Sequence, residues 1–253
     1  MDDSKLYNYW GKASFTDESF HLLVYHCLDV AAMGQVLLRQ SLQKYPRDDV
    51  LTQNVTQNKE ASISLISFFL ALHDIGKFSK GFQNYKPEIV NIFQGELYEE
   101  LNHKKSKKHD LIGFYLWQKM WSNIWQENWL NLDKSFDEKD WKKLLDLWFK
   151  SIMNHHNRDQ INDFSITQDN IASDLTEEDI STAYFYVKKV ADLLLDNKSK
   201  MKLLNMQNIG DYSLYISDFL QDIAVKSDRI ILFDKSKYFP YNSRYMLIQQ
   251  YWQ

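Results

Sequence analysis

The spacing of apolar and polar positions along the chain predicts a protein built mostly of helices. Apolar residues recur at helical intervals on one broad face of 16–42, and 62–73 is mostly apolar, as in a buried helix. Gly76 supplies the stop signal after this second helix. Further helices are expected over 109–130, 137–153, 176–195 and 212–233.

The segments between these helices are expected to be loops inside one domain. Residues 79–108 are polar, and 131–136 and 158–173 have the same loop character. The run from Thr176 to Asp179 resembles a capping box that opens the next helix. No internal repeat and no linker rich in Pro, Gly or Ser divides the chain. We therefore expect an all-α protein in which residues 1–253 form a single globular domain.

Composition narrows the class of protein. Hydrophobic residues make up 44% and charged residues 25% of the chain, which is the globular range, and 7 Gly and 3 Pro favour helices over many short strands. The single cysteine, Cys27, excludes an internal disulfide and a cysteine zinc cluster, and it fits a reducing cytosol. The acidic N-terminus and the lack of an apolar run of about 18 residues predict a cytoplasmic protein with no secretory signal and no membrane span.

An adjacent His-Asp pair, His73 and Asp74, closes the apolar helix and is the first candidate for chemistry. The two residues lie about 100° apart around a helix axis, so both can lean toward one cavity, where the carboxylate can bridge two cations. A bare His-Asp pair is more often structural, with a buried, hydrogen-bonded histidine. Here Gly76 and Lys77 follow, which adds a helix stop and a cation placed to meet a phosphate.

Four more histidines are candidate ligands. His26 lies between apolar neighbours and is favoured as a ligand, although a lone histidine on such a face is more often a core residue. His109 opens a helix. His155 and His156 form a tandem pair after an amphipathic helix, where metal binding and a simple interaction with the helix dipole are equally open. His21 lies about 140° from His26 around the helix, so we expect it to be structural.

Carboxylates and lysines extend this set. The last predicted helix carries Asp218, Asp222 and Asp228, any of which could complete a metal shell or belong to an acidic surface stripe. The formal net charge of −4 argues against general capture of nucleic acid but allows a local basic channel. A basic run before His109 is either a solvated loop or a region that draws in a polyanion; it comprises Lys104, Lys105, Lys107 and Lys108.

Imidazoles with a bridging carboxylate favour Mn, Fe, Co, Ni or Zn over Mg, so these residues predict a metal-dependent phosphohydrolase. The sequence has neither a GxxxxGK[ST] phosphate loop nor a GxSxG elbow, which excludes a nucleoside-triphosphate motor and a serine hydrolase of that type. Histidine ligands must be neutral, so activity is expected to fall below about pH 6.5.

The ordered set resembles the HD superfamily, and more specifically the HD nuclease domain of the CRISPR type I helicase–nuclease. The similarity begins at Tyr9-Trp10-Gly11-Lys12 and continues through 22–32. It peaks at 71–78, which Phe82-Gln83 follow. His109 with Gly113-Phe114-Tyr115 and the pair His155-His156 extend it over most of the chain.

This resemblance implies an all-helical HD fold and a nuclease that cuts single-stranded DNA with two divalent transition-metal ions, of Mn, Fe, Co or Ni. It further implies a CRISPR surveillance complex of the Cascade type as partner, and a separate helicase subunit. Lys77 would lie beside the scissile phosphate and act with Asp74 in catalysis. The implied ligands of one metal are His26, His73, Asp74 and a late Asp, and those of the other are Asp74, His109, His155 and His156.

Two departures from the family pattern keep alternatives open. The family's late Asp follows Ala and precedes Trp, whereas the segment taken to correspond here is 220–224, so Asp222 is our choice. The helicase half is absent from the sequence. One alternative is therefore a non-catalytic HD-domain mimic that binds the surveillance complex and blocks nuclease recruitment. A further alternative is an HD nucleotide phosphohydrolase.

Overall fold

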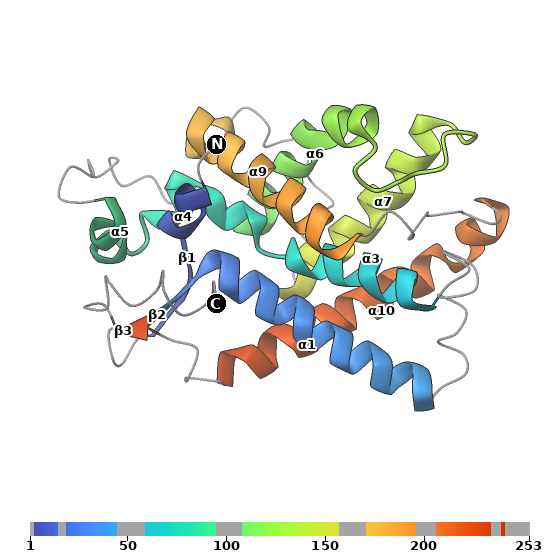
Figure 1. The fold of residues 1–253 in the computed structure, drawn as a ribbon, viewed down its shortest axis with the longest axis horizontal. Coiled ribbons are helices and arrows are strands. Elements are labelled where there is room, and N and C mark those ends of the chain that lie inside the picture. Colours follow the sequence, from blue (N-terminus) through green and yellow to red (C-terminus); the bar gives the residue numbers. More distant parts are fainter. Residues whose placement is uncertain are drawn as a thin grey trace.

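The computed structural model describes residues 3–14, 19–44, 59–94, 108–156, 171–195, 206–233 and 239–240, and it is dominated by helices (Figure 1). The predicted all-α class is confirmed. The α-helices are α1 (Leu23–Lys44), α3 (Lys59–Ala71), α4 (Lys80–Gln83), α5 (Pro87–Gln94), α6 (His109–Glu127), α7 (Glu138–Met153), α9 (Glu177–Leu194) and α10 (Met206–Phe233). Short 3-10 turns are η1 (Asp3–Asn8), η3 (Ile75–Phe78), η4 (Asn154–His156) and η6 (Ala172–Asp174).

The core forms where α1 packs against α3 and α10, and where α7 packs against α10 (Figure 1). Every residue of α3 from Ala61 to Ala71 except Ser64 is buried, as its almost continuous apolar sequence predicts. The main apolar cluster joins this helix to the inner faces of α1, α6, α7, α9 and α10. Because α3 runs through the middle of this cluster, its C-terminal end delivers the His-Asp pair into the interior of the protein.

A small antiparallel sheet flanks the helices and corrects one predicted boundary. It has the order β1-β2-β3, with β1 at Trp10–Ala13, β2 at Ser19–Leu22 and β3 at Phe239–Pro240. The helix expected over 16–42 therefore begins only at Leu23, because the residues before it pair with β1. This pairing depends on contacts between strands, which helical spacing within one segment does not report.

The ends of the other predicted helices agree with the structure within about three residues, except that α10 begins at Met206 rather than at 212. The capping box is confirmed, since the Thr176 hydroxyl accepts from the Asp179 N–H while the Asp179 carboxylate accepts from the Thr176 N–H. Helix α6 ends at Glu127 rather than at 130, because Asn128 adopts the left-handed conformation (φ 51°).

The polar segment 79–108 contains α4 and α5, which are short helices that the sequence did not reveal. Among the described residues, no helix is long and apolar enough to span a membrane.

Candidate metal centre

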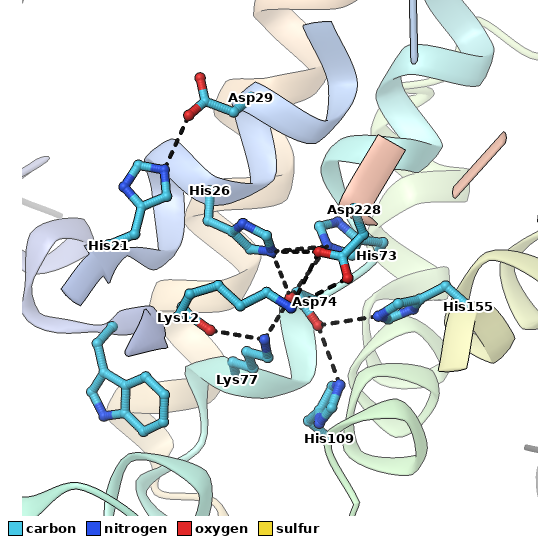
Figure 2. Close-up of polar contacts among 12 residues, drawn as sticks. Lys12, His21, His26, Asp29, His73, Asp74, Lys77, His109, His155 and Asp228 are labelled. Carbon is cyan, nitrogen blue, oxygen red and sulfur yellow. Dashed lines mark hydrogen bonds and ion pairs between the residues drawn. The ribbon is translucent and has the colours of Figure 1, made fainter. Parts of the chain in front are cut away.

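The His-Asp pair lies in the turn that ends α3. The chain leaves the helix through tighter hydrogen bonds, from the Leu72 N–H to the Phe69 carbonyl and from the His73 N–H to the Leu70 carbonyl, at 3.0 and 3.2 Å. The side chains of His73 and Asp74 are completely buried. Figure 2 shows Asp74 at the centre of a ring of imidazoles and ammonium groups that come from distant parts of the chain.

Backbone carbonyls orient two of the imidazoles around Asp74. The Nδ1 atom of His73 lies 2.9 Å from the Leu70 carbonyl, and Nδ1 of His155 lies 3.0 Å from the Ile152 carbonyl. A carbonyl only accepts, so each Nδ1 carries the proton and each Nε2 presents a lone pair to the centre. This is the arrangement by which proteins fix the tautomer of metal-binding histidines.

His26 from α1 and His109 from the start of α6 complete the ring. His26 Nε2 lies 3.0 Å from Asp74 Oδ2 and 3.2 Å from His73 Nε2. On the other carboxylate oxygen, Asp74 Oδ1 lies 3.2 Å from His109 Nε2 and 3.8 Å from His155 Nε2. The structure thus brings together four of the five histidines that the sequence nominated.

The late carboxylate of the centre is Asp228, which corrects the expectation for Asp222. Asp228 Oδ1 lies 3.4 Å from His26 Nε2 and 4.0 Å from His73 Nε2. Asp222 lies on the outer face of α10, where its half-exposed carboxylate pairs with Lys226 at 2.5 Å. The buried positions of α10 indicate the reason, because they recur at helical spacing through Leu220, Ala224 and Asp228, and Asp222 lies outside this series.

Several remaining candidates lie elsewhere or outside the described residues. His21 is buried with its Nε2 atom 3.0 Å from Asp29 Oδ2, which agrees with the structural role expected for it. His156 ends η4, but its side chain lies outside the described residues. Three lysines of the basic run also lie outside the described residues, namely Lys104, Lys105 and Lys107. Lys108, the fourth, is half-buried at the N-cap of α6.

Two lysines lie at one side of the centre (Figure 2). Lys77 Nζ is 2.7 Å from Asp74 Oδ2 and donates to the Gly11 carbonyl at 2.8 Å. Lys12 Nζ, from β1, is 3.2 Å from Asp228 Oδ1. Sequence reasoning nominated Lys77 but missed Lys12, whose only signal was its place in the Tyr9-Trp10-Gly11-Lys12 run.

The arrangement of polar atoms is suited to a bound cation. His26 Nε2 can carry one proton, yet it faces acceptor atoms of Asp74, His73 and Asp228 at 3.0, 3.2 and 3.4 Å. The lone pair of His73 Nε2 also lies 3.2 Å from Asp74 Oδ2, so two acceptors face each other. The buried atom Asp74 Oδ1 forms no hydrogen bond of normal geometry among the described residues, although His109 Nε2 lies 3.2 Å from it. Such a set of nitrogen and oxygen donors fits divalent transition metals.

Two groups of donor atoms lie close enough together to share an ion. His26, His73 and Asp228 form one group, and His73, Asp74 and His155 form the other, with the ligand atoms of each group within 4.8 Å of one another. His73 therefore belongs to both groups, and Asp74 of the second group lies 3.0 Å from His26 of the first through its Oδ2 atom. His109 approaches only the second position, through Asp74 Oδ1.

Burial and neighbouring charges set the protonation states of the centre. Burial lowers the pKa of His26 from 6.5 to about 4 and also lowers the pKa of His109, so both are neutral at pH 7. Burial alone raises the pKa of Asp74, but Lys77 and His73 outweigh it and hold the pKa well below the usual range. Asp228 is likewise held ionised, because His26 and Lys12 outweigh the effect of burial on its pKa. His26 and His109 are thus neutral and Asp74 and Asp228 ionised, which are the forms that bind metals.

A glycine contact sets the approach of α6 to the centre. A Cβ atom at Gly76 would lie 1.7 Å from the His109 carbonyl oxygen and 2.6 Å from the Gly113 nitrogen. Only a residue without a side chain allows the first turn of α6 to rest directly on η3. This contact brings His109 within reach of Asp74.

Comparison with known proteins supports the same family. The model of the family described as "Cas3, HD domain" matches residues 10–213. The CRISPR-associated endonuclease/helicase Cas3 of Escherichia coli (strain K12) is 40% identical over 79 residues, which cover 30% of this chain and 9% of that protein.

A solved structure described as the crystal structure of a CRISPR-associated protein aligns with 90% of this chain and 22% of its own, with a TM-score of 0.55. At 18% identity this likeness supports the fold alone. The chain therefore corresponds to a small part of each of these longer proteins. Because the family match covers most of the chain and includes the ring of donors around Asp74, the protein belongs to the Cas3 HD domain family.

Proposed function

We propose that this chain is a metal-dependent nuclease that hydrolyses phosphodiester bonds of single-stranded DNA in type I CRISPR interference. The observation that carries the proposal is the buried convergence of neutral imidazoles on two ionised carboxylates, Asp74 and Asp228. The family membership and the name of the Escherichia coli relative, an endonuclease/helicase, support the choice of a nucleic-acid substrate.

The donor atoms would hold two divalent cations of Mn, Fe, Co or Ni. His26, His73 and Asp228 would hold one, and His73 or Asp74 with His155 and His109 would hold the other, with Asp74 placed to bridge them. Bound metals of this kind polarise a phosphoryl oxygen and generate a nucleophile from water at neutral pH. His156 stays a proposed ligand on the strength of the resemblance.

The protein's own residues do the binding and orienting. Asp74, held ionised by Lys77, keeps its charge in a fully buried position, where electrostatic interactions are stronger than in water. Lys77 places an ammonium group beside the bridging carboxylate, where it can bind a non-bridging oxygen of the phosphodiester. The carbonyls of Leu70 and Ile152 hold the imidazoles of His73 and His155 in the tautomer that binds metals.

Further partners remain part of the proposal. A Cascade-like surveillance complex would deliver the displaced strand, and a separate helicase subunit would feed it to the centre. Lys104, Lys105, Lys107 and Lys108 would guide the DNA backbone. The non-catalytic alternative was motivated in part by the altered segment at 220–224. Asp228 beside His26 supplies a late carboxylate to the centre and so supports the catalytic proposal.

The test is incubation of metal-stripped protein with labelled single-stranded DNA and Mn²⁺, Ni²⁺ or Co²⁺. We expect cleavage by wild type and none by Asp74→Ala. Asp222→Ala, which alters an exposed carboxylate outside the centre, should cut at the wild-type rate and serves as the matched control. No cleavage by wild type would contradict the proposal. Hydrolysis of mononucleotides alone would favour the nucleotide phosphohydrolase instead.

A further inference from the structure

Lys12 lies at the centre without a role in the set of ligands described above. Its ammonium group is 3.2 and 3.3 Å from the two oxygens of Asp228, and its side chain is only 14% exposed. A lysine at this depth needs a compensating anion, because burial of an unpaired charge is unfavourable. In the metal-free protein Asp228 provides such an anion, and the same carboxylate belongs to the first group of metal donors, with His26 and His73.

The strand that carries Lys12 is attached directly to the segment that carries Lys77. The buried amide of Gln83 accepts from the Trp10 N–H at 3.0 Å and donates to the Trp10 carbonyl at 3.0 Å. The same amide nitrogen donates to the Lys77 carbonyl at 2.8 Å. Lys77 in turn donates to the carbonyl of Gly11, next to Lys12. One side chain thus fixes the positions of two lysines relative to each other.

Each lysine pairs with one of the two carboxylates of the centre. Lys77 contacts Asp74, and Lys12 contacts Asp228, both from the same side (Figure 2). His109 and His155 approach Asp74 from the other side. A cation bound by His26, His73 and Asp228 would take over the negative charge that now holds Lys12. The ammonium group would then be released from Asp228, and the phosphodiester is the anion that the proposed reaction brings to this place.

We propose that Lys12 is a substrate-binding cation that exchanges from Asp228 to a non-bridging phosphate oxygen of the DNA when the first metal position is filled. The inference rests on the proposed function, and it adds to Lys77 a second arm of a phosphate clamp. Before metal binds, Lys12 keeps the charge of Asp228 compensated. After metal binds, it contributes to holding the substrate.

This exchange predicts effects of opposite sign on two measurements. Removal of the Lys12 charge eliminates a competitor of the metal, so Lys12→Met should bind Mn²⁺ about tenfold more tightly than wild type. The same change removes a cation that contacts the substrate, so cleavage of single-stranded DNA should fall about 100-fold. A residue that only supported the fold would weaken both properties together.

The experiment compares metal-stripped wild type, Lys12→Met and Lys226→Met by calorimetric titration with Mn²⁺ and by cleavage assays. Lys226 is a matched control, because it forms the same kind of ion pair with Asp222 on the exposed face of α10. It should behave as wild type in both assays. Lys12→Gln removes the same charge with a side chain that can still donate to Asp228, and it replaces Lys12→Met if that variant fails to fold.

Two results would overturn the inference. One is a folded Lys12 variant whose Mn²⁺ affinity equals or falls below that of wild type. The other is a variant that binds the metal more tightly and yet cuts DNA at the wild-type rate. Failure of the proposed function is distinguishable from both, since wild type would then cut no DNA while the metal titrations still decide whether Lys12 competes for Asp228.

Discussion

Asp222 and Asp228 lie six residues apart on α10, and each pairs with a lysine, yet their surroundings differ completely. The Asp222 side chain is 52% exposed and its partner Lys226 is on the same helix. The Asp228 side chain is 7% exposed, and its partner Lys12 is 216 residues away in the chain. Six residues turn a helix by about 240°, which carries one carboxylate to solvent and the other to the interior.

Both pairs join an aspartate to a lysine, so the difference shows that exposure to solvent, and not the residue types, determines how strongly an ion pair interacts. Water screens the pair of Asp222 and Lys226, so it contributes little beyond local helix stability. Asp228 has lost its water and faces His26 and His73, so its charge must be compensated by groups held at fixed positions. A cation that enters this group therefore gains far more than a cation at the surface would.

The largest expected effect separates these two carboxylates by activity. Asp228→Asn should lower DNA cleavage about 1,000-fold, because it removes a charged donor in a dry site. Asp222→Asn should leave the rate unchanged. Initial rates with Mn²⁺ and labelled single-stranded DNA measure both, and circular dichroism confirms folding. Equal losses in the two variants would show that the burial of Asp228 is irrelevant to the reaction.

Acid should destabilise the folded protein through His26, the buried neighbour of Asp228. Burial lowers the pKa of His26 from 6.5 to about 4. Between about pH 4 and pH 6.5 this histidine therefore binds a proton in the unfolded chain but not in the folded protein. The free energy of unfolding should thus fall as the pH drops through this interval, by about 3 kcal/mol for this one residue. Urea unfolding of chelator-treated protein from pH 7 to pH 4 measures it. A His26→Asn variant should lose this part of the slope, and an unchanged slope would refute the assignment.

Part of the stabilisation of the folded protein by metal should depend on the buried carboxylate of Asp228 and none on that of Asp222. Mn²⁺ at about 100 times its dissociation constant should add about 2.7 kcal/mol, which raises the melting temperature by about 5–10 °C. Thermal scans with and without the metal provide the measurement. Wild type and Asp222→Asn should show the same increase. If Asp228→Asn gained as much as wild type, Asp228 would not be a ligand of the metal.

The smallest expected effect concerns the exposed pair. A double-mutant cycle over Asp222→Asn and Lys226→Met should give a coupling of about 0.5 kcal/mol, or about 1–2 °C in melting temperature. High salt should reduce this coupling further. A coupling of several kcal/mol, measured by urea unfolding, would place this pair in the same class as Asp228 and Lys12.

The sequence predicted most helices, the capping box at Thr176 and the histidines of the centre, because each of these has a local signal. The choice of Asp222 failed because residues 220–224 were matched to the family's late Asp segment, although Asp222 lies on the exposed side of α10. Ile230 is 42% exposed, whereas the small residue Ser227 is completely buried beside Asp228. A match over five residues therefore did not show which side of the helix is buried, and the buried stripe of α10 contains serine and alanine, which give only a weak apolar signal.

The sheet and Lys12 could not be predicted for a different reason. β2 is defined by its pairing with β1, and Lys12 is defined by its contact with a residue near the other end of the chain. Both depend on contacts that form only when the whole chain has folded. The family resemblance covered Lys12 within a run of similar residues, but it attached no role to that position.

The rigid approach of Gly76 to the first turn of α6 has a practical consequence for redesign. Main-chain atoms touch there, and the spacing between His109 and Asp74 follows from that touch rather than from the size of any apolar side chain. Core substitutions that repack α3 against α7 would therefore leave this spacing intact. A single added methyl group at position 76 would instead collide with the His109 carbonyl and push His109 away from Asp74.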